Sequence, residues 1–252
     1  MATGQVHAGQ SGLVYAALGD SMSIDHYAGG PGRGAASLLW RNRDDDFPAW
    51  AGQDLTAHDP VVHLALLASD GATSTTVVGE QLQQLHRLEL IPTLATVTMG
   101  GNDLLAAYGD SGAGRLAIQS MTHNGQRLLA SLRALMGPMA PIVVATVYDP
   151  SDGTGDPVRL GLPVWPEALD LLAELNQALR TLAQEHRALV ADVHGRFLGH
   201  GLAIGDPAQS DPRPSNRDLW YCGLIEPNAW GASEIRATFW EVLAINGDRE
   251  RS

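Results

Sequence analysis

The sequence predicts a single three-layer α/β/α domain built on a parallel sheet. Short apolar runs, each suited to one buried strand, recur along the chain, and the segments between them carry leucine and valine at helical spacing. No internal repeat or low-complexity linker divides the 252 residues. Strands that alternate with long helices form right-handed βαβ units, which place helices on both faces of a parallel sheet. We therefore expect one α/β domain over residues 12–252, preceded by a flexible leader at residues 1–11.

The expected strands are the apolar runs themselves. They occupy residues 13–18, 61–68, 94–99, 142–148 and 189–193. The expected helices follow from the spacing of their apolar residues and from the residues that begin or end them. The first helix begins at 35–40 and the second spans 73–90. The third carries the stripe Leu128, Leu132 and Leu135 and ends at Gly137-Pro138. The fourth runs from Pro166 through Leu182, and the last spans 228–245. Segments 29–34, 149–157 and 199–218 are rich in glycine, proline and aspartate and predict loops.

The composition excludes several classes of protein. A hydrophobic content of 44% is ample for a core, and a net charge of −12 argues against nucleic acid or an anionic membrane surface as the main partner. No run approaches the roughly 20 apolar residues of a membrane span, and the first residues lack the basic start of a signal peptide. We therefore expect a cytoplasmic protein. The single cysteine, Cys222, excludes an internal disulfide and is expected to be a small buried side chain rather than a reactive thiol.

The first candidate for chemistry is Ser21. The first expected strand runs into Gly19-Asp20-Ser21, which places a serine hydroxyl at the carboxyl end of a strand. In open α/β sheets this edge is where ligands bind, and a serine there is well placed to act as a nucleophile. The alternative interpretation is a serine or aspartate cap on a surface helix.

Two later blocks favour the catalytic interpretation. Asp70-Gly71-Ala72-Thr73 follows the second expected strand, and Gly100-Gly101-Asn102-Asp103 follows the third. All three blocks are expected at one edge of the sheet. In this order they resemble the SGNH or GDSL hydrolase superfamily, whose signature is a GDS serine, a glycine, a GxND asparagine and a final Asp-x-x-His pair. The resemblance implies five parallel strands in flavodoxin-like order and an acyl-enzyme on Ser21. It also implies an oxyanion hole formed by the N–H groups of Ser21 and Gly71 and by the side-chain amide of Asn102.

The fourth block differs from the family pattern. The family typically reads Asp-x-x-His-Pro-Asn, whereas this chain reads Gly223-Leu224-Ile225-Glu226-Pro227-Asn228, with Glu226 at the histidine position. Three proton carriers therefore stay open. His200, in a glycine-flanked turn after the fifth strand, is the first choice, with Glu226 orienting it, because a histidine pKa suits serine at neutral pH. Glu226 itself is the second, since burial can raise a glutamate pKa to 6–7. His194 is the third.

Aromatic side chains near the site suggest a binding surface. His26 lies five residues beyond Ser21 and is expected to line the pocket. Trp220 and Tyr221 are candidate substrate-binding residues and are equally well explained as core anchors, whereas Trp230 is expected in the core.

Cofactor and metal sites are not expected. Loop 29–34 has no Walker lysine and does not follow a strand directly, so a substrate-lining loop is expected rather than a phosphate site. The aspartates at 44–46 predict a solvated loop, and no histidine pair shows the spacing of a zinc motif.

The resulting hypothesis is a serine hydrolase that cleaves a small carboxylic ester, of the esterase or carbohydrate deacetylase type, without a cofactor. Its substrate partner would be a small ester or an acylated sugar. The alternative is a catalytically reduced relative that binds a small ligand without turnover. A nucleotide-binding α/β protein is a third hypothesis, against which the missing Walker and Rossmann fingerprints count.

Overall fold

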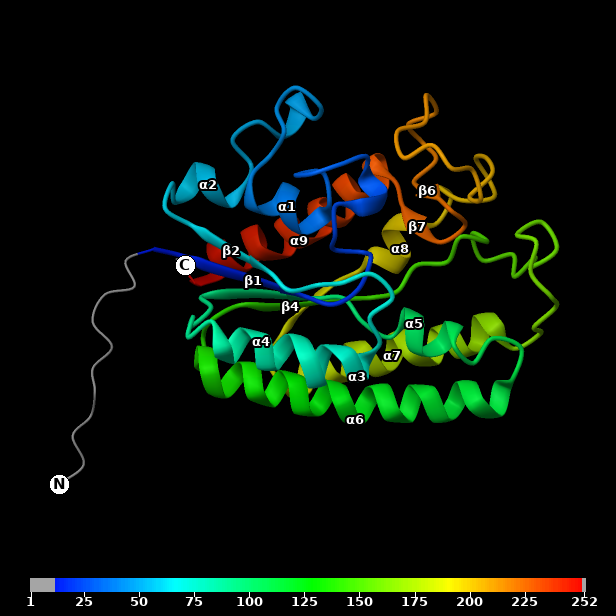
Figure 1. Ribbon diagram of the computed structural model, residues 1–252, viewed down its shortest axis with the longest axis horizontal. Coiled ribbons are helices and arrows are strands. Elements are labelled where there is room, and N and C mark those ends of the chain that lie inside the picture. Colours follow the sequence, from blue (N-terminus) through cyan, green and yellow to red (C-terminus); the bar gives the residue numbers. More distant parts are fainter. Residues whose placement is uncertain (1–11, 251–252) are drawn as a thin grey trace.

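A computed structural model describes residues 12–250, with side chains to residue 244. The predicted leader, 1–11, lies outside the described residues. A five-stranded sheet forms the middle layer, with helices on both of its faces (Figure 1). Its strands are β1 (Val14–Leu18), β2 (His63–Leu66), β3 (Leu94–Val97), β4 (Ile142–Ala145) and β5 (Leu189–Ala191). They are all parallel and lie in the order β2-β1-β3-β4-β5, which confirms the predicted fold class and strand order.

The two helical layers bury opposite faces of each strand. Ala16 and Leu18 of β1 pack into one core, and Tyr15 and Ala17 pack into the other, because successive side chains of a strand point to opposite faces. The first layer contains α3 (Ser74–Thr76), a π-helical turn (Val77–Gln81), α4 (Leu82–Arg87), α6 (Ser111–Met136) and α7 (Ala168–Glu185). The second layer contains α1 (Ala35–Trp40), α8 (Val193–Phe197) and α9 (Ala229–Glu250). Both faces of the sheet are therefore covered (Figure 1).

The shorter elements include several that the sequence pattern did not predict. They are α2 (Leu55–His58), α5 (Gly101–Leu105), 3₁₀ helices at His26–Ala28 and Pro48–Trp50, and a two-stranded antiparallel hairpin of β6 (Tyr221–Cys222) and β7 (Glu226–Pro227). The fifth strand ends at Ala191, earlier than predicted, because the Asp192 carboxylate accepts the backbone N–H of Gly195 and begins α8. Over the described residues, no helix is long and apolar enough to cross a membrane.

Candidate active site

The three predicted blocks meet at the carboxyl edge of the sheet. Ser21 follows β1, Gly71 follows β2 and Asn102 lies in α5, directly after β3. Because β1 lies between β2 and β3, the turns that follow these strands are neighbours in space. The three blocks span some eighty positions in the sequence but lie close together around Ser21 in the structure. The side chain of Ser21 is buried.

The turn that carries Ser21 requires glycine at position 19. Gly19 has a φ of 134°, and a Cβ built there would lie 2.0 Å from the carbonyl oxygen of Thr98. Its backbone N–H donates to Oε1 of Gln81 at 2.7 Å, and its carbonyl accepts from Nε2 of Gln81 at 2.8 Å. One buried side-chain amide therefore satisfies both backbone groups two residues before Ser21. The role of Gln81 was not predicted, because a glutamine within a helical pattern gives no signal of a partner 62 residues away.

Asp20 and Thr98 hold the other side of this turn. The N–H of Asp20 donates to Oγ1 of Thr98 at 3.1 Å, and Oδ1 of Asp20 accepts the N–H of Met22 at 3.1 Å. Burial raises the pKa of Asp20 to about 6, although its hydrogen bonds oppose the shift. Asp20 therefore acts as a buried acceptor beneath Ser21.

The second and third blocks are bonded to each other. Nδ2 of Asn102 donates to the carbonyl oxygen of Ala72 at 3.0 Å, and the Asp103 carboxylate accepts the N–H of Ser74 at 2.8 Å and its hydroxyl at 2.6 Å. A side-chain amide has two N–H donors, so Asn102 keeps one for a further acceptor. Gly71 has a φ of 67° and open space where a Cβ would stand, so the backbone conformation accounts for this glycine.

Glu226 faces Ser21 from the β6–β7 hairpin. Burial is the main cause that raises its pKa to about 7; the charges of Asp70 and Asp20 add to the shift, and a hydrogen bond with Ser21 opposes it. Among the described residues, Oε2 of Glu226 is buried and has no hydrogen-bond partner. A carboxylate in this setting exchanges a proton near neutral pH.

Bonds from three directions fix the hairpin. The Tyr148 hydroxyl donates to the carbonyl of Ile225 at 2.6 Å, next to Glu226. Nδ2 of Asn228 donates to the carbonyls of Leu219 and Tyr221 at 2.6 and 3.2 Å. Oδ1 of Asn228 accepts N–H groups at the first turn of α9. The Pro-Asn that follows Glu226 therefore joins the hairpin to α9.

The structure does not bring His200 to this group. Its ring stacks on Trp220 with centroids 3.3 Å apart, and its Nδ1 pairs with the carbonyl of Asp218 at 2.8 Å. His194 pairs its Nδ1 with the carbonyl of Val147 at 3.1 Å, within the first turn of α8. In the part of the chain that the structure describes, neither ring shows a hydrogen bond or ring contact to Ser21 or Glu226.

The candidate substrate-binding residues also lie elsewhere. Tyr221 is fully buried and packs edge-on against Tyr148 and Phe197, and Trp220 packs against Phe197. Both side chains are buried by long-range packing, which favours the core-anchor interpretation of the two that the sequence left open. His26 is exposed and contacts Tyr27.

Cys222 is buried in the same hairpin. Burial is the first cause that raises the pKa of its thiol to about 11. A thiol that holds its proton in this way is a poor nucleophile, which agrees with the predicted small buried side chain.

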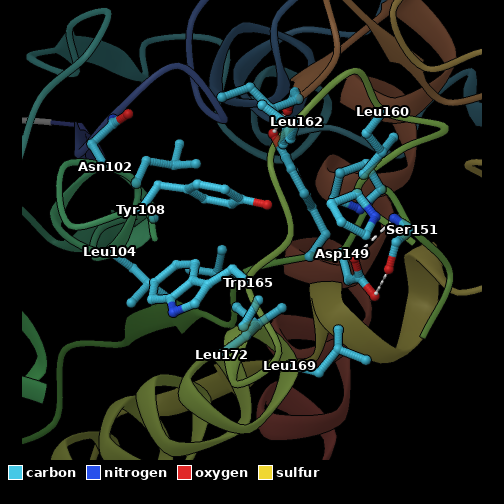
Figure 2. A pocket seen from close by; sticks show the side chains of 18 of the residues that line it. Asn102, Leu104, Tyr108, Asp149, Ser151, Leu160, Leu162, Trp165, Leu169 and Leu172 are labelled. Carbon is cyan, nitrogen blue, oxygen red and sulfur yellow. Dashed lines mark hydrogen bonds between the residues drawn. The ribbon is translucent and has the colours of Figure 1, made fainter. Parts of the chain in front are cut away.

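A cavity opens beside Ser21 (Figure 2). Its volume is about 150 Å³, and its lining includes Ser21, Asn102 and residues of the segment that joins β4 to α7. Figure 2 shows Asn102 and the apolar side chains that surround this space. Most of the lining side chains are apolar or aromatic. None of His26, His200, Trp220 and Tyr221 is among the described residues that line it. The candidate active site is therefore Ser21 with Glu226 on one side and an apolar cavity on the other.

Solved structures share this fold at low sequence identity. A member of the lipolytic G-D-S-L family from Veillonella parvula has 14% identity and a TM-score of 0.60, over 92% of this chain and 98% of that chain. A variant of an acetyl xylan esterase from Geobacillus stearothermophilus has 14% identity and a TM-score of 0.61, over 92% and 94%. An extracellular lipase from Streptomyces rimosus has 20% identity and a TM-score of 0.56, over 92% and 98%.

The sequence matches no curated protein. The structural similarities, at these identities, establish the fold alone. A family model supplies the assignment, since it matches residues 17–232 and so includes all four blocks. The chain belongs to the GDSL-like lipase/acylhydrolase family.

Proposed function

We propose that this protein hydrolyses a carboxylic ester through an acyl-enzyme on Ser21, with Glu226 as the proton carrier. The observation that carries the proposal is the placement of a buried carboxylate, with a pKa raised to about 7, against the serine of the GDS block. Membership of a family of lipases and acylhydrolases supports the reaction class. An acetyl xylan esterase among the structural neighbours makes a small or acylated-sugar ester a candidate substrate.

The proposed first half-reaction forms the acyl-enzyme. Ionised Glu226 takes the proton of the Ser21 hydroxyl while the serine oxygen bonds to the ester carbonyl carbon. The N–H groups of Ser21 and Gly71 and the second N–H of Asn102 stabilise the resulting oxyanion. The bond to the alcohol then breaks, and the departing oxygen takes the proton from Glu226. Water repeats these steps on the acyl-enzyme and releases the carboxylic acid and free Ser21.

The choice of Glu226 over His200 rests on placement. A base must come within hydrogen-bond reach of the proton that it takes, and the position of the base is weighed before its pKa. Glu226 interacts with Ser21, whereas the His200 ring is stacked on Trp220. His200 would have to leave both Trp220 and the Asp218 carbonyl to act in a relay.

Hydrolysis of p-nitrophenyl esters, followed in variants, tests the proposal. Ser21→Ala should abolish turnover without changing the far-ultraviolet circular dichroism spectrum, and a fluorophosphonate should label Ser21 in the wild type. Glu226→Gln should lower kcat by about 10²–10⁴-fold, the usual contribution of general acid–base catalysis. His200→Ala is the control for the relay and should keep wild-type activity.

Two results would overturn this mechanism. An inactive His200→Ala alongside an active Glu226→Gln would make His200 the base. A wild type that hydrolyses no ester, with Ser21 unreactive to the fluorophosphonate, would favour a protein that binds a ligand without turnover.

A further inference from the structure

The walls of the cavity beside Ser21 are apolar, and they come from three segments. Leu104 and Tyr108 belong to α5 and the turn after it, Leu160 and Leu162 to the segment between β4 and α7, and Leu169 and Leu172 to the first turns of α7. Figure 2 shows these side chains around one space, with Asn102 at its border. A carbon chain attached at Ser21 would pass directly among them.

The polar groups of these walls are already bonded inside the protein. The Tyr108 hydroxyl donates to the carbonyl of Pro163 at 3.1 Å, and Nε1 of Trp165 donates to Oγ of Ser111 at 2.9 Å. The Asp149 carboxylate accepts the N–H and the hydroxyl of Ser151, each at 2.8 Å (Figure 2). The two aromatic rings therefore offer the cavity their apolar surfaces. A sugar hydroxyl placed between them would lose hydrogen bonds to water without replacement.

The placement of Glu226 decides which half of the ester enters the cavity. Glu226 gives its proton to the leaving alcohol, so the alcohol must lie on the side of Glu226. Of the described residues, Ser21 and Asn102 line the cavity and Glu226 does not. The acyl group stays bonded to Ser21 after the alcohol leaves, and the cavity begins at Ser21. The geometry therefore assigns the cavity to the acyl group.

The volume of the cavity sets the size of that group. A dry cavity of about 150 Å³ lined by leucine and aromatic side chains holds one benzene, or about six carbons, and the cavity here measures about 150 Å³. An acetyl group would leave most of it unfilled. We propose that the cavity binds an apolar acyl group of about six carbons, a hexanoyl chain or a benzoyl ring, in preference to acetyl. This substrate class rests on the proposed acyl-enzyme at Ser21.

A series of p-nitrophenyl esters from acetate to dodecanoate tests the assignment. Each buried methylene favours binding about fourfold, so kcat/KM should rise roughly 100-fold or more from acetate to hexanoate. It should then stop rising, because longer chains outgrow the cavity. Ala168→Phe fills the cavity from the first residue of α7 and should lower kcat/KM for hexanoate at least tenfold more than for acetate. Ala130→Phe makes the same change on the exposed surface of α6 and should leave both values unchanged.

Binding without chemistry separates this assignment from the proposed function. Hexanamide and acetamide are added to the Ser21→Ala variant, and saturation-transfer NMR reports which one binds. Hexanamide should bind, acetamide should not, and Ala168→Phe introduced with Ser21→Ala should remove the signal. These results would support the acyl pocket even if the wild type hydrolysed no ester. Ester hydrolysis that depends on Ser21 but is fastest on acetate, and indifferent to Ala168→Phe, would overturn the acyl pocket and leave the proposed function standing.

Discussion

A carboxylate becomes a stronger base near neutral pH when its surroundings raise its pKa. Burial does so for Glu226, with the charges of Asp70 and Asp20 adding to it. These surroundings also have a cost in stability, because the folded protein must hold an ionised group that water would solvate better. The same residue is therefore expected to serve catalysis and to weaken the fold at alkaline pH.

Replacement of Glu226 by glutamine tests this cost. The folded-state pKa, about 7, lies above the ordinary value of 4.5, so the folded state binds more protons than the unfolded state between these pH values. Stability contributed through Glu226 is then fully present below pH 4.5 and is lost as the pH rises through 7. Glu226→Gln should melt at a higher temperature than the wild type at pH 8, with the difference shrinking towards pH 4. Equal melting temperatures at both pH values would show that Glu226 is not destabilised by burial.

Asn102 has a role that can be measured separately. Its amide holds Ala72 with one N–H, and the proposal gives the other to the oxyanion. Asn102→Ala should lower kcat by about 10²–10³-fold with little change in KM, as for the loss of one oxyanion donor. Asn124→Ala is the matched control, since Asn124 bonds the hydroxyls of Ser74 and Thr75 in the same region and is given no catalytic role. A loss confined to KM would make Asn102 a substrate-binding residue instead.

At the scale of elements, the turn after β1 depends on a helix of another layer. Gln81 ends the π-helical turn Val77–Gln81, and its buried amide binds both backbone groups of Gly19. The π turn places this amide against the backbone that leads to Ser21. The orientation of the Ser21 N–H, a proposed oxyanion donor, therefore depends on an element distant in the sequence.

Removal of the Gln81 amide should lower both the stability of the protein and the rate of ester hydrolysis. Gln81→Met keeps the length of the side chain but leaves the N–H of Gly19 without a partner, whereas the Gly19 carbonyl still accepts the N–H of Ser69 at 3.0 Å. The free energy of unfolding should fall by about 1–3 kcal/mol, the usual cost of one unsatisfied buried group, and kcat should fall more than KM changes. Urea denaturation and ester kinetics measure the two effects. Gln84→Met, on the exposed side of the same helix, should change neither, and an equally silent Gln81→Met would refute the role given to Gln81.

The element that carries Glu226 shows why sequence patterns have limits. The β6–β7 hairpin has two residues in each strand. It is fixed by the side chain of Tyr148, which is distant in the sequence, and by that of Asn228, which directly follows the hairpin. Two-residue strands give no alternating pattern, so the hairpin was not predicted. The family resemblance marked Glu226 by its position before Pro227-Asn228, but only the packing of the hairpin shows that it faces Ser21.

For the whole molecule, the parallel sheet follows from regular sequence patterns, whereas the order of its strands was implied by the family resemblance. Five apolar runs separated by helical segments predict a parallel sheet, and all five strands of the observed sheet are parallel. The first three blocks then meet, because parallel strands end at one edge. The sequence does not reveal which distant residues a side chain contacts in the folded protein. His200 was expected to reach Ser21 and Trp220 was a candidate for substrate binding, yet their rings stack on each other. Tyr221 packs against Phe197 and Tyr148 in the core.

If Glu226 is the base that activates Ser21, the pH dependence of kcat/KM must follow the ionisation of its carboxylate. Measurements on the wild type, His200→Ala and Glu226→Gln with one p-nitrophenyl ester suffice. The wild-type rate should fall as the pH drops below about 7, where Glu226 becomes protonated. His200→Ala should show the same profile at the same height, and Glu226→Gln should lose both the inflection and most of the rate. An inflection that disappears in His200→Ala but persists in Glu226→Gln would identify His200, and not Glu226, as the base.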